Sequence, residues 1–263
     1  MPTLSNEPHH QRQMAESFGA DADRYDRTRP GYPDALVARL AAGGRDVLDV
    51  GCGTGIAARQ FQAAGCRVLG VEPDERMAQL ARRTGIETEI ATFETWDPAG
   101  RTFDTVVAGQ AWHWVDPEAG AAKAAQALRS GGRLAVFWNA FQLPSGLSEA
   151  ISAVYRRAVP DSPIVQRAMS VGSEAYTALN VTASDGMRRT GAFGEPEEWR
   201  FGWERRYTRD EWLEQVPTSG IHGRLSPDQQ TEVLAGIGAA IDAVGGDFTM
   251  SYTTVAAVAT RTS

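Results

Sequence analysis

The feature that most constrains this chain is the stretch Val47-Leu48-Asp49-Val50-Gly51-Cys52-Gly53-Thr54-Gly55. An apolar, strand-like run leads directly into three glycines at alternate positions, and Ile56 to Ala64 then has helical spacing. Glycine can adopt positive φ and lets a ligand approach the backbone with no Cβ in the way. The pattern therefore predicts a strand, a glycine turn and a helix. Asp49, at the carboxyl end of this strand, would repel a phosphate and favour a cationic ligand.

A second apolar strand, Val68 to Val71, ends in another acid, Glu72, and is followed by Pro73. In a doubly wound fold this position lies beside the glycine turn, where a carboxylate can accept hydrogen bonds from the two hydroxyls of a ribose. Pro73 favours an extended Glu72 and suits the first position of the next helix. Asp49-x-Gly51-x-Gly53-x-Gly55 together with Glu72 resembles the cofactor signature of class I S-adenosylmethionine (SAM) methyltransferases, and the resemblance covers most of the chain.

The alternation of strand and helix patterns predicts an α/β fold with a Rossmann-like, seven-stranded, doubly wound sheet. Phe248 to Thr260 is expected to form an antiparallel edge strand, so the mostly parallel sheet would end in a C-terminal hairpin. The resemblance adds a helical insertion after the fifth strand. Four parts are expected: a cofactor-covering segment at 1–33, a SAM-binding core at 34–139, a helical insertion shaping the acceptor pocket at 140–195, and the rest of the same sheet at 196–263.

Further cofactor contacts follow from the resemblance. The N-terminal segment would fold over the cofactor and place Tyr25 and Arg29 near the methionine carboxylate, although a loop held on the sheet edge by its aromatics explains the same residues. Met77 can touch adenine or simply pack in the core. Thr92 and Phe93, after the third strand, would hold the adenine edge, or form an ordinary strand-to-helix turn.

The stretch Gln110-Ala111-Trp112-His113-Trp114 follows the fourth strand and should border the reactive methyl group. It resembles the corresponding stretch in small-molecule methyltransferases of the trans-aconitate methyltransferase type, and Gln110 joins the expected cofactor contacts. His113 is the candidate catalytic residue, as a base for a hydroxyl or as a group that orients a carboxylate. It can equally be a packed histidine that holds its tryptophan neighbours. The weaker candidates for acceptor binding are Trp112, Trp114, Trp138 and His222.

These observations predict a SAM-dependent methyltransferase that moves a methyl group to a small molecule, most simply to the oxygen of a carboxylate or hydroxyl. The alternatives are a SAM-binding protein without catalysis and an N- or C-methyltransferase of a secondary metabolite. A nicotinamide enzyme is disfavoured, although Gly53-x-Gly55-x-x-Ala58 matches the dinucleotide fingerprint, because Asp49 would repel a pyrophosphate.

Composition narrows the partners and the compartment. A net charge of −7 and the lack of a basic stripe argue against nucleic acid. His9 and His10 are adjacent but have no further ligands nearby in sequence, so no metal is expected. Two cysteines are too few for a disulfide framework, and no apolar run reaches 18 residues, which favours a cytoplasmic protein without membrane spans. The oligomeric state is left open.

Overall fold

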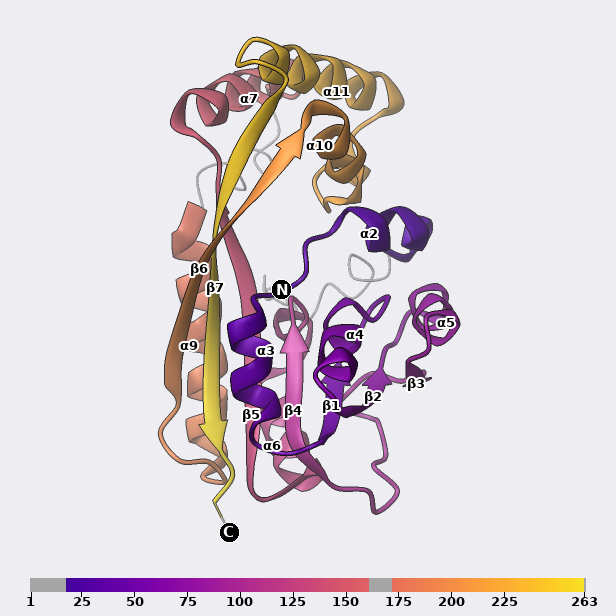
Figure 1. The fold of residues 1–263 in the computed structure, drawn as a ribbon, viewed down its shortest axis with the longest axis vertical. Helices are drawn as coiled ribbons and strands as arrows, with labels where there is room; N and C mark the ends of the chain where they lie inside the picture. The colour runs from indigo at the N-terminus through magenta and orange to yellow at the C-terminus, as the bar shows by residue number, and fades with distance from the viewer. Residues whose placement is uncertain (1–17, 161–171, 263) are drawn as a thin grey trace, which may run out of the picture.

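The computed structural model describes residues 18–160 and 172–262. The predictions for His9, His10 and the rest of the first seventeen residues lie outside this range. Seven strands form a single sheet in the order β3-β2-β1-β4-β5-β7-β6 (Figure 1). Their bounds are β1 Asp46–Val50, β2 Arg67–Val71, β3 Glu87–Glu89, β4 Phe103–Gly109, β5 Leu128–Gln142, β6 Glu197–Thr208 and β7 Asp247–Thr260. The first five strands are parallel, and β7 is antiparallel to both of its neighbours. The expected seven-stranded, mostly parallel α/β sheet is confirmed.

The prediction that the last strand lies at the edge of the sheet is wrong. β7 lies between β5 and β6, so β6 forms the edge. The reason is visible in burial: β7 contains a continuous buried run, Val255–Ala259, as a strand covered on both faces requires, whereas much of β6 alternates between buried or half-buried and exposed positions.

Two helical layers cover the sheet. The α-helices are α2 Ala22–Thr28, α3 Asp34–Ala41, α4 Ile56–Ala63, α5 Glu75–Arg83, α6 Pro117–Ala127, α7 Ser145–Ala158, α9 Gly172–Thr190, α10 Arg209–Gln215 and α11 Pro227–Asp242. Short 3-10 turns are η2 Phe18–Asp21, η3 Trp112–Trp114, η4 Val216–Thr218 and η5 His222–Arg224. Helices α3 and α4 share a buried cluster with one face of the sheet, and α6 and α9 share a cluster with the other face (Figure 1).

The segment 140–195, expected to be one helical insertion, divides between two places. Helix α7 packs with α11 through Leu147, Ile151 and Ile237, in a cluster that also holds residues of α10. Helix α9 instead lies on the sheet beside α6, and Gly186 allows the close approach, since a Cβ there would come within 2.3 Å of the carbonyl oxygen of Pro117. Helices α7, α10 and α11 form one group, which we call the helical cap (Figure 1). Of the segment 140–195, only α7 therefore belongs to this cap.

The helix starts of the cap are fixed by local sequence. Thr208 accepts a hydrogen bond from the amide of Glu211, and Glu211 accepts from the amide of Thr208, as the sequence Thr-x-x-Glu predicts. Ser226 and Gln229 form the same reciprocal pair at the start of α11. These bonds set where the two cap helices begin.

Candidate functional site

The glycine turn after β1 has the predicted backbone conformation. Gly51, Gly53 and Gly55 have φ values of 63°, 56° and 88°, the left-handed region that favours glycine. A Cβ on Gly51 would come within 2.5 Å of Cβ of Ala111, so this glycine is needed for packing against the loop after β4. A Cβ on Gly53 would meet no described atom within 4 Å. Gly53 is therefore the point where a ligand can approach the main chain.

Glu72 ties the glycine turn to the second strand. Its Oε2 accepts a hydrogen bond of 2.9 Å from the amide of Gly53, and its Oε1 accepts one of 2.9 Å from the amide of Asp74. Each carboxylate oxygen has a second lone pair, so both can still accept from the hydroxyls of a ribose. The sequence predicted a ligand contact at Glu72; its role in holding Gly53 was not foreseen.

Asp49 is the buried acid at the centre of this turn. It is 1% exposed, and its Oδ2 makes no hydrogen bond to any described residue. Burial, with a further contribution from the charge of Glu72, raises the pKa of Asp49 to about 8. Burial likewise raises the pKa of Glu72 to about 7, against the effect of its two amide hydrogen bonds. Two crowded, poorly solvated carboxyl groups of this kind would be stabilised by a bound cation.

The described part of the N-terminal segment, residues 18–33, includes α2, which contacts α5 and α10. That this segment covers a cofactor stays a prediction. Tyr25 packs beside Met77 of α5, and Arg29 stacks over the Tyr25 ring at 5.0 Å. Arg29 also donates a 2.6 Å hydrogen bond to the carbonyl oxygen of Thr218 in the cap, so it links two parts of the molecule.

Tyr32 is a neighbour of the site that the sequence reasoning did not assign. Its hydroxyl would be 2.6 Å from a Cβ on Gly109, the last residue of β4, and its ring packs edge-on against Phe137 at 4.7 Å. Burial raises the pKa of Tyr32 well above its usual value. Only its place in an aromatic, arginine-containing segment hinted at this position.

The loop after β4 turns sharply at Gln110, which has a φ of 56°, a conformation that is rare for residues other than glycine. Its amide donates to the carbonyl oxygen of Phe137 on β5. His113 follows in η3, half-buried, and its Nδ1 accepts a 3.2 Å hydrogen bond from Nε1 of Trp138. The Trp114 ring lies 4.6 Å from the His113 ring. Burial lowers the pKa of His113 to about 4, so the ring is neutral at pH 7.

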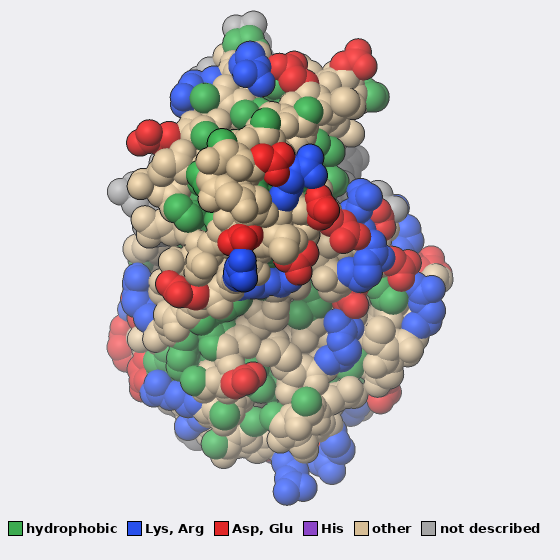
Figure 2. Space-filling view, turned by 45° about the horizontal axis from the view of Figure 1, so that its top comes forward, with side chains coloured by type: hydrophobic (Ala, Val, Ile, Leu, Met, Phe, Trp, Pro, Cys, Tyr) green, Lys and Arg blue, Asp and Glu red, His purple; other side chains and the backbone are tan. Residues whose placement is uncertain are grey.

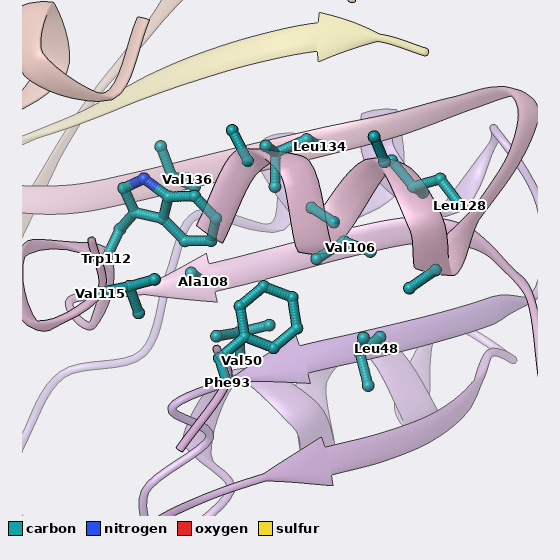
Figure 3. Close-up of a cluster of buried hydrophobic side chains, with 14 of the residues drawn as sticks. Leu48, Val50, Phe93, Val106, Ala108, Trp112, Val115, Leu128, Leu134 and Val136 are labelled. Carbon is teal, nitrogen blue, oxygen red and sulfur yellow. The ribbon is translucent and has the colours of Figure 1, made fainter. Parts of the chain in front are cut away.

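Two tryptophans predicted to bind the acceptor lie in the core instead. Trp112 and Trp138 are 2% and 1% exposed, and Trp112 packs on the sheet face below α6 (Figure 3). Trp112 lies in the loop after β4 and Trp138 lies on β5, and the sequence could not show that both rings would be buried in one core cluster. Trp138 still contributes indirectly, through its hydrogen bond to His113.

Four further residues predicted to contact the cofactor are Pro73, Met77, Thr92 and Phe93. Phe93 is 3% exposed and points into the same core cluster as Trp112 (Figure 3), so its side chain packs there and only its backbone remains for an adenine ring. Met77 is also buried, against α2. Thr92 is half-buried and shares a 2.8 Å hydrogen bond with Thr95, while Pro73 is exposed. That these residues hold the adenine ring stays a prediction.

His222 lies in η5, next to the helical cap, where it is 3% exposed. Its Nδ1 has no hydrogen-bond partner among the described residues. Burial, with a smaller contribution from Arg24, lowers the pKa of His222. Its contact with an acceptor stays a prediction.

A separate hollow of about 540 Å³ lies at the opposite end of the sheet. It is lined by residues that include Arg39, Arg133, Glu195 and Trp199, and Arg39 stacks on Trp199 at 3.5 Å. These residues surround the start of β6 and the end of β7, far along those strands from the turn and the cap. The hollow takes no part in the site described above.

The described residues also bear on metal binding, membrane spans and surface charge. No cluster of three or more histidine, cysteine, aspartate or glutamate side chains is placed to bind a metal ion there. None of the helices in this part of the chain has the length and apolar character that crossing a membrane would need. Acidic and basic side chains are intermixed on the face shown in Figure 2 and form no basic stripe on it.

Residues 48–136 match the methyltransferase domain family. An uncharacterized methyltransferase of Mycobacterium tuberculosis is 38% identical over 131 residues, which is 49% of this chain and 54% of that relative. The match thus spans about half the length of the relative.

Solved structures share the fold. A putative type II methyltransferase from Anaeromyxobacter dehalogenans superposes with a TM-score of 0.63 at 23% identity, covering 89% of this chain and 97% of its own. Phosphoethanolamine N-methyltransferase 2 of Haemonchus contortus, solved with phosphomonomethylethanolamine and S-adenosylhomocysteine, gives a TM-score of 0.53 at 15% identity, over 99% of this chain and 61% of its own. The fold is that of the α/β methyltransferases. Residues 48–136 are thus similar to a methyltransferase domain, and the described chain shares the fold of solved methyltransferases.

Proposed function

We propose that this chain, in which residues 48–136 match the methyltransferase domain family, is a cytoplasmic SAM-dependent methyltransferase acting on the oxygen of a small-molecule carboxylate or hydroxyl. The observation that carries the proposal is the pair of buried acids beside an open main-chain turn. Oδ2 of Asp49 lacks a hydrogen-bond partner in the described chain, Glu72 holds the Gly53 amide, and no described atom lies where a Gly53 Cβ would point.

These residues fit SAM. The cofactor carries a positively charged sulfonium whose methyl group is already electrophilic. Asp49 and Glu72 supply negative charge in a poorly solvated turn, where it acts over a short distance with little screening. Tyr25 and Arg29 close the edge above, with Arg29 suited to a carboxylate. The remaining task is to align an acceptor, and alignment alone can supply about 7 to 11 kcal/mol of rate acceleration.

The acceptor side rests on weaker support. The resemblance of Gln110 to Trp114 to methyltransferases of the trans-aconitate type favours a carboxylate. His113 follows two residues after Ala111, whose Cβ is 2.5 Å from the position that a Gly51 Cβ would take. In this proposal α7 and the rest of the helical cap shape the acceptor pocket, with Trp114 and His222 as candidate contacts. Transfer to nitrogen or carbon, and SAM binding without transfer, are the competing functions.

A ligand-stabilisation experiment tests the cofactor. SAM at about 100 times its dissociation constant should stabilise the fold by about 2.7 kcal/mol, measured as a thermal shift. The Asp49→Ala variant should lose this shift, and NAD should cause none in either protein. A matched control is Asp46→Ala, which removes an acid from the other end of the same strand, where it pairs with Arg67 and Arg129.

Two outcomes would contradict the proposal: a shift with NAD but not with SAM, or an equal SAM shift in the Asp49 and Asp46 variants. Labelled-methyl transfer from SAM into a panel of metabolite acids, phenols and amines then separates an enzyme from a binding protein. The class of acceptor labelled identifies the acceptor atom.

A further inference from the structure

The hydrogen bond between Trp138 and His113 fixes which nitrogen of the imidazole carries the proton. The indole N–H is only a donor, so the atom it contacts, Nδ1 of His113, must be the unprotonated nitrogen. A neutral imidazole carries one proton, which then resides on Nε2. Trp138 is 1% exposed and held in the core, so this donor has a fixed position.

The other edge of the His113 ring is free. Within the described chain, Nε2 of His113 makes no hydrogen bond. It is not a fully buried atom, so the half-buried ring leaves this nitrogen accessible. The preceding residues place it at the site: Gln110 bends the chain, and Ala111 touches the position of a Gly51 Cβ. A nitrogen already protonated cannot accept a proton from an acceptor hydroxyl.

We propose that His113 is a neutral hydrogen-bond donor that orients the acceptor through Nε2–H, that Trp138 is its positioning residue, and that the acceptor is a carboxylate. This inference rests on the proposed function and names its substrate class. An ionised carboxylate has no proton to lose, so a site without a general base suffices.

The reaction balances without a proton transfer. One carboxylate oxygen accepts the hydrogen bond from His113, and the other forms a bond to the methyl carbon. The carbon–sulfur bond breaks, its electron pair stays on sulfur, and the products are a neutral methyl ester and S-adenosylhomocysteine. A neutral alcohol would instead leave a proton that His113, in this tautomer, cannot take.

Nitrogen-15 NMR of histidine-labelled protein tests the tautomer without any acceptor. The chain has four histidines, and His113→Gln identifies the signals of interest by removing them. At pH 7 we expect His113 to be neutral with the proton on Nε2. Trp138→Phe should redistribute the proton between the two nitrogens. A proton on Nδ1, or an imidazolium, in the native protein would overturn the proposal.

Three variants test the role of His113 in methyl transfer, and the thermal shift of each with SAM is measured first. The side chain of Gln can place an N–H near the position of His Nε2 but cannot act as a base, whereas Leu offers neither. With labelled SAM and a panel of small organic acids paired with the matching alcohols, the acids alone should be methylated. His113→Gln should keep most of kcat/KM, while His113→Leu and Trp138→Phe should lose it by about ten- to a hundredfold and about fivefold respectively.

The outcomes separate cleanly. If His113→Gln is as inactive as His113→Leu while both keep the SAM shift, the donor role is wrong. If alcohols alone are methylated, or nothing in the panel is, the carboxylate assignment is wrong. If the native protein shows no thermal shift with SAM, this result contradicts the proposed function and not the role of His113.

Discussion

At the scale of single residues, Asp49 shows a carboxyl group held where its charge is disfavoured. It is buried, Glu72 lies close enough to raise its pKa further, and none of the described residues donates a hydrogen bond to its Oδ2. Such a group lowers the stability of the unliganded fold, because ionising it costs more in the folded than in the unfolded chain. The burial of Asp49 is therefore explained by binding of a ligand and not by the stability of the fold.

We therefore expect Asp49→Asn to stabilise the unliganded protein while weakening SAM binding. The pKa of Asp49 is raised from its unfolded value near 4 to about 8, so between these pH values the folded state holds a proton that the unfolded state has released. Native stability thus falls as pH rises through this window, and the advantage of the Asn variant should grow to a few kcal/mol by pH 8. Denaturant unfolding at pH 5 and pH 8 measures it; an Asn variant less stable than the native protein at pH 8 would refute the argument.

SAM affinity should depend on pH in the opposite sense. A cation binds best when both acids are ionised, and burial raises the pKa values of Asp49 and Glu72 to about 8 and about 7. The dissociation constant for SAM, measured by calorimetry, should therefore fall as pH rises from 6 to 8. Asp49→Asn should flatten this dependence, and a native affinity that is constant over this range would count against the cationic site.

Sequence predicted the positions of these acids at the ends of β1 and β2, because strand ends and alternate glycines are local patterns. It failed for Trp112 because the direction of that side chain depends on the non-glycine left-handed turn at Gln110. It failed for Trp138 because the burial of a residue within β5 depends on the helices α6 and α9 that cover the sheet. Tyr32 was missed for a similar reason, since its partner Gly109 lies 77 residues further along the chain.

At the scale of elements, a partly buried chain of hydrogen bonds joins three strands to the N-terminal segment. Trp203 of β6 donates to Oγ1 of Thr254 at 2.9 Å, Thr254 donates to Oδ1 of Asn139 at 2.7 Å, and Asn139 donates to the carbonyl oxygen of Gly31 at 3.0 Å. Gly31 immediately precedes Tyr32. The network thus connects the outer strands to the segment that covers the site.

Replacing Thr254 by valine should break this network at its centre. Valine keeps the shape but leaves the Trp203 N–H and the Asn139 oxygen buried without partners, which should cost about 1 to 3 kcal/mol in the free energy of unfolding. Thr254→Ser is the control, because it keeps the hydroxyl and loses only a methyl group. Chemical denaturation of both variants checks the order; a valine variant as stable as the native protein would show that the hydrogen bonds contribute little.

Although β5 is longer than its apolar run and includes Gly131 and Gly132, the apolar run Val68 to Val71 made strand β2, Arg67–Val71, predictable to within one residue. Helix α9 was not predictable, because its buried face uses small and polar residues such as Asn180, Ala183 and Gly186, which give weak helical periodicity. The interior place of β7 was also hidden, since pairing order is a property of the whole sheet.

At the scale of the whole molecule, α2 lies between α5 and the helical cap. It packs on Met77 of α5, and at its other side Arg27 pairs with Glu214 of α10 at 2.7 Å (Figure 1). Arg29, just after α2, donates to Thr218. Helix α2 and Arg29 therefore connect α5, which follows the second strand, with α10 and the 3-10 turn after it.

Hydrogen exchange followed by mass spectrometry should show this coupling. SAM should slow amide exchange in the glycine turn 51–55, in α2 and in α10, because each is connected to the bound region. Exchange around the hollow at Arg39 and Trp199 should not change, and NAD should slow none of these segments. Protection confined to the glycine turn would mean that α2 does not respond to the cofactor.

The position of β7 has a consequence for how the molecule is made. Strand β6, which leads into α10 of the cap, pairs with the sheet through β7, whose residues leave the ribosome about fifty positions later. During synthesis, one edge of β5 therefore has no paired strand until β7 is made. This edge can meanwhile mispair with other nascent chains. Chaperone demand in the cell should be governed by this delay rather than by the parallel half, whose strands can associate in the order of their translation.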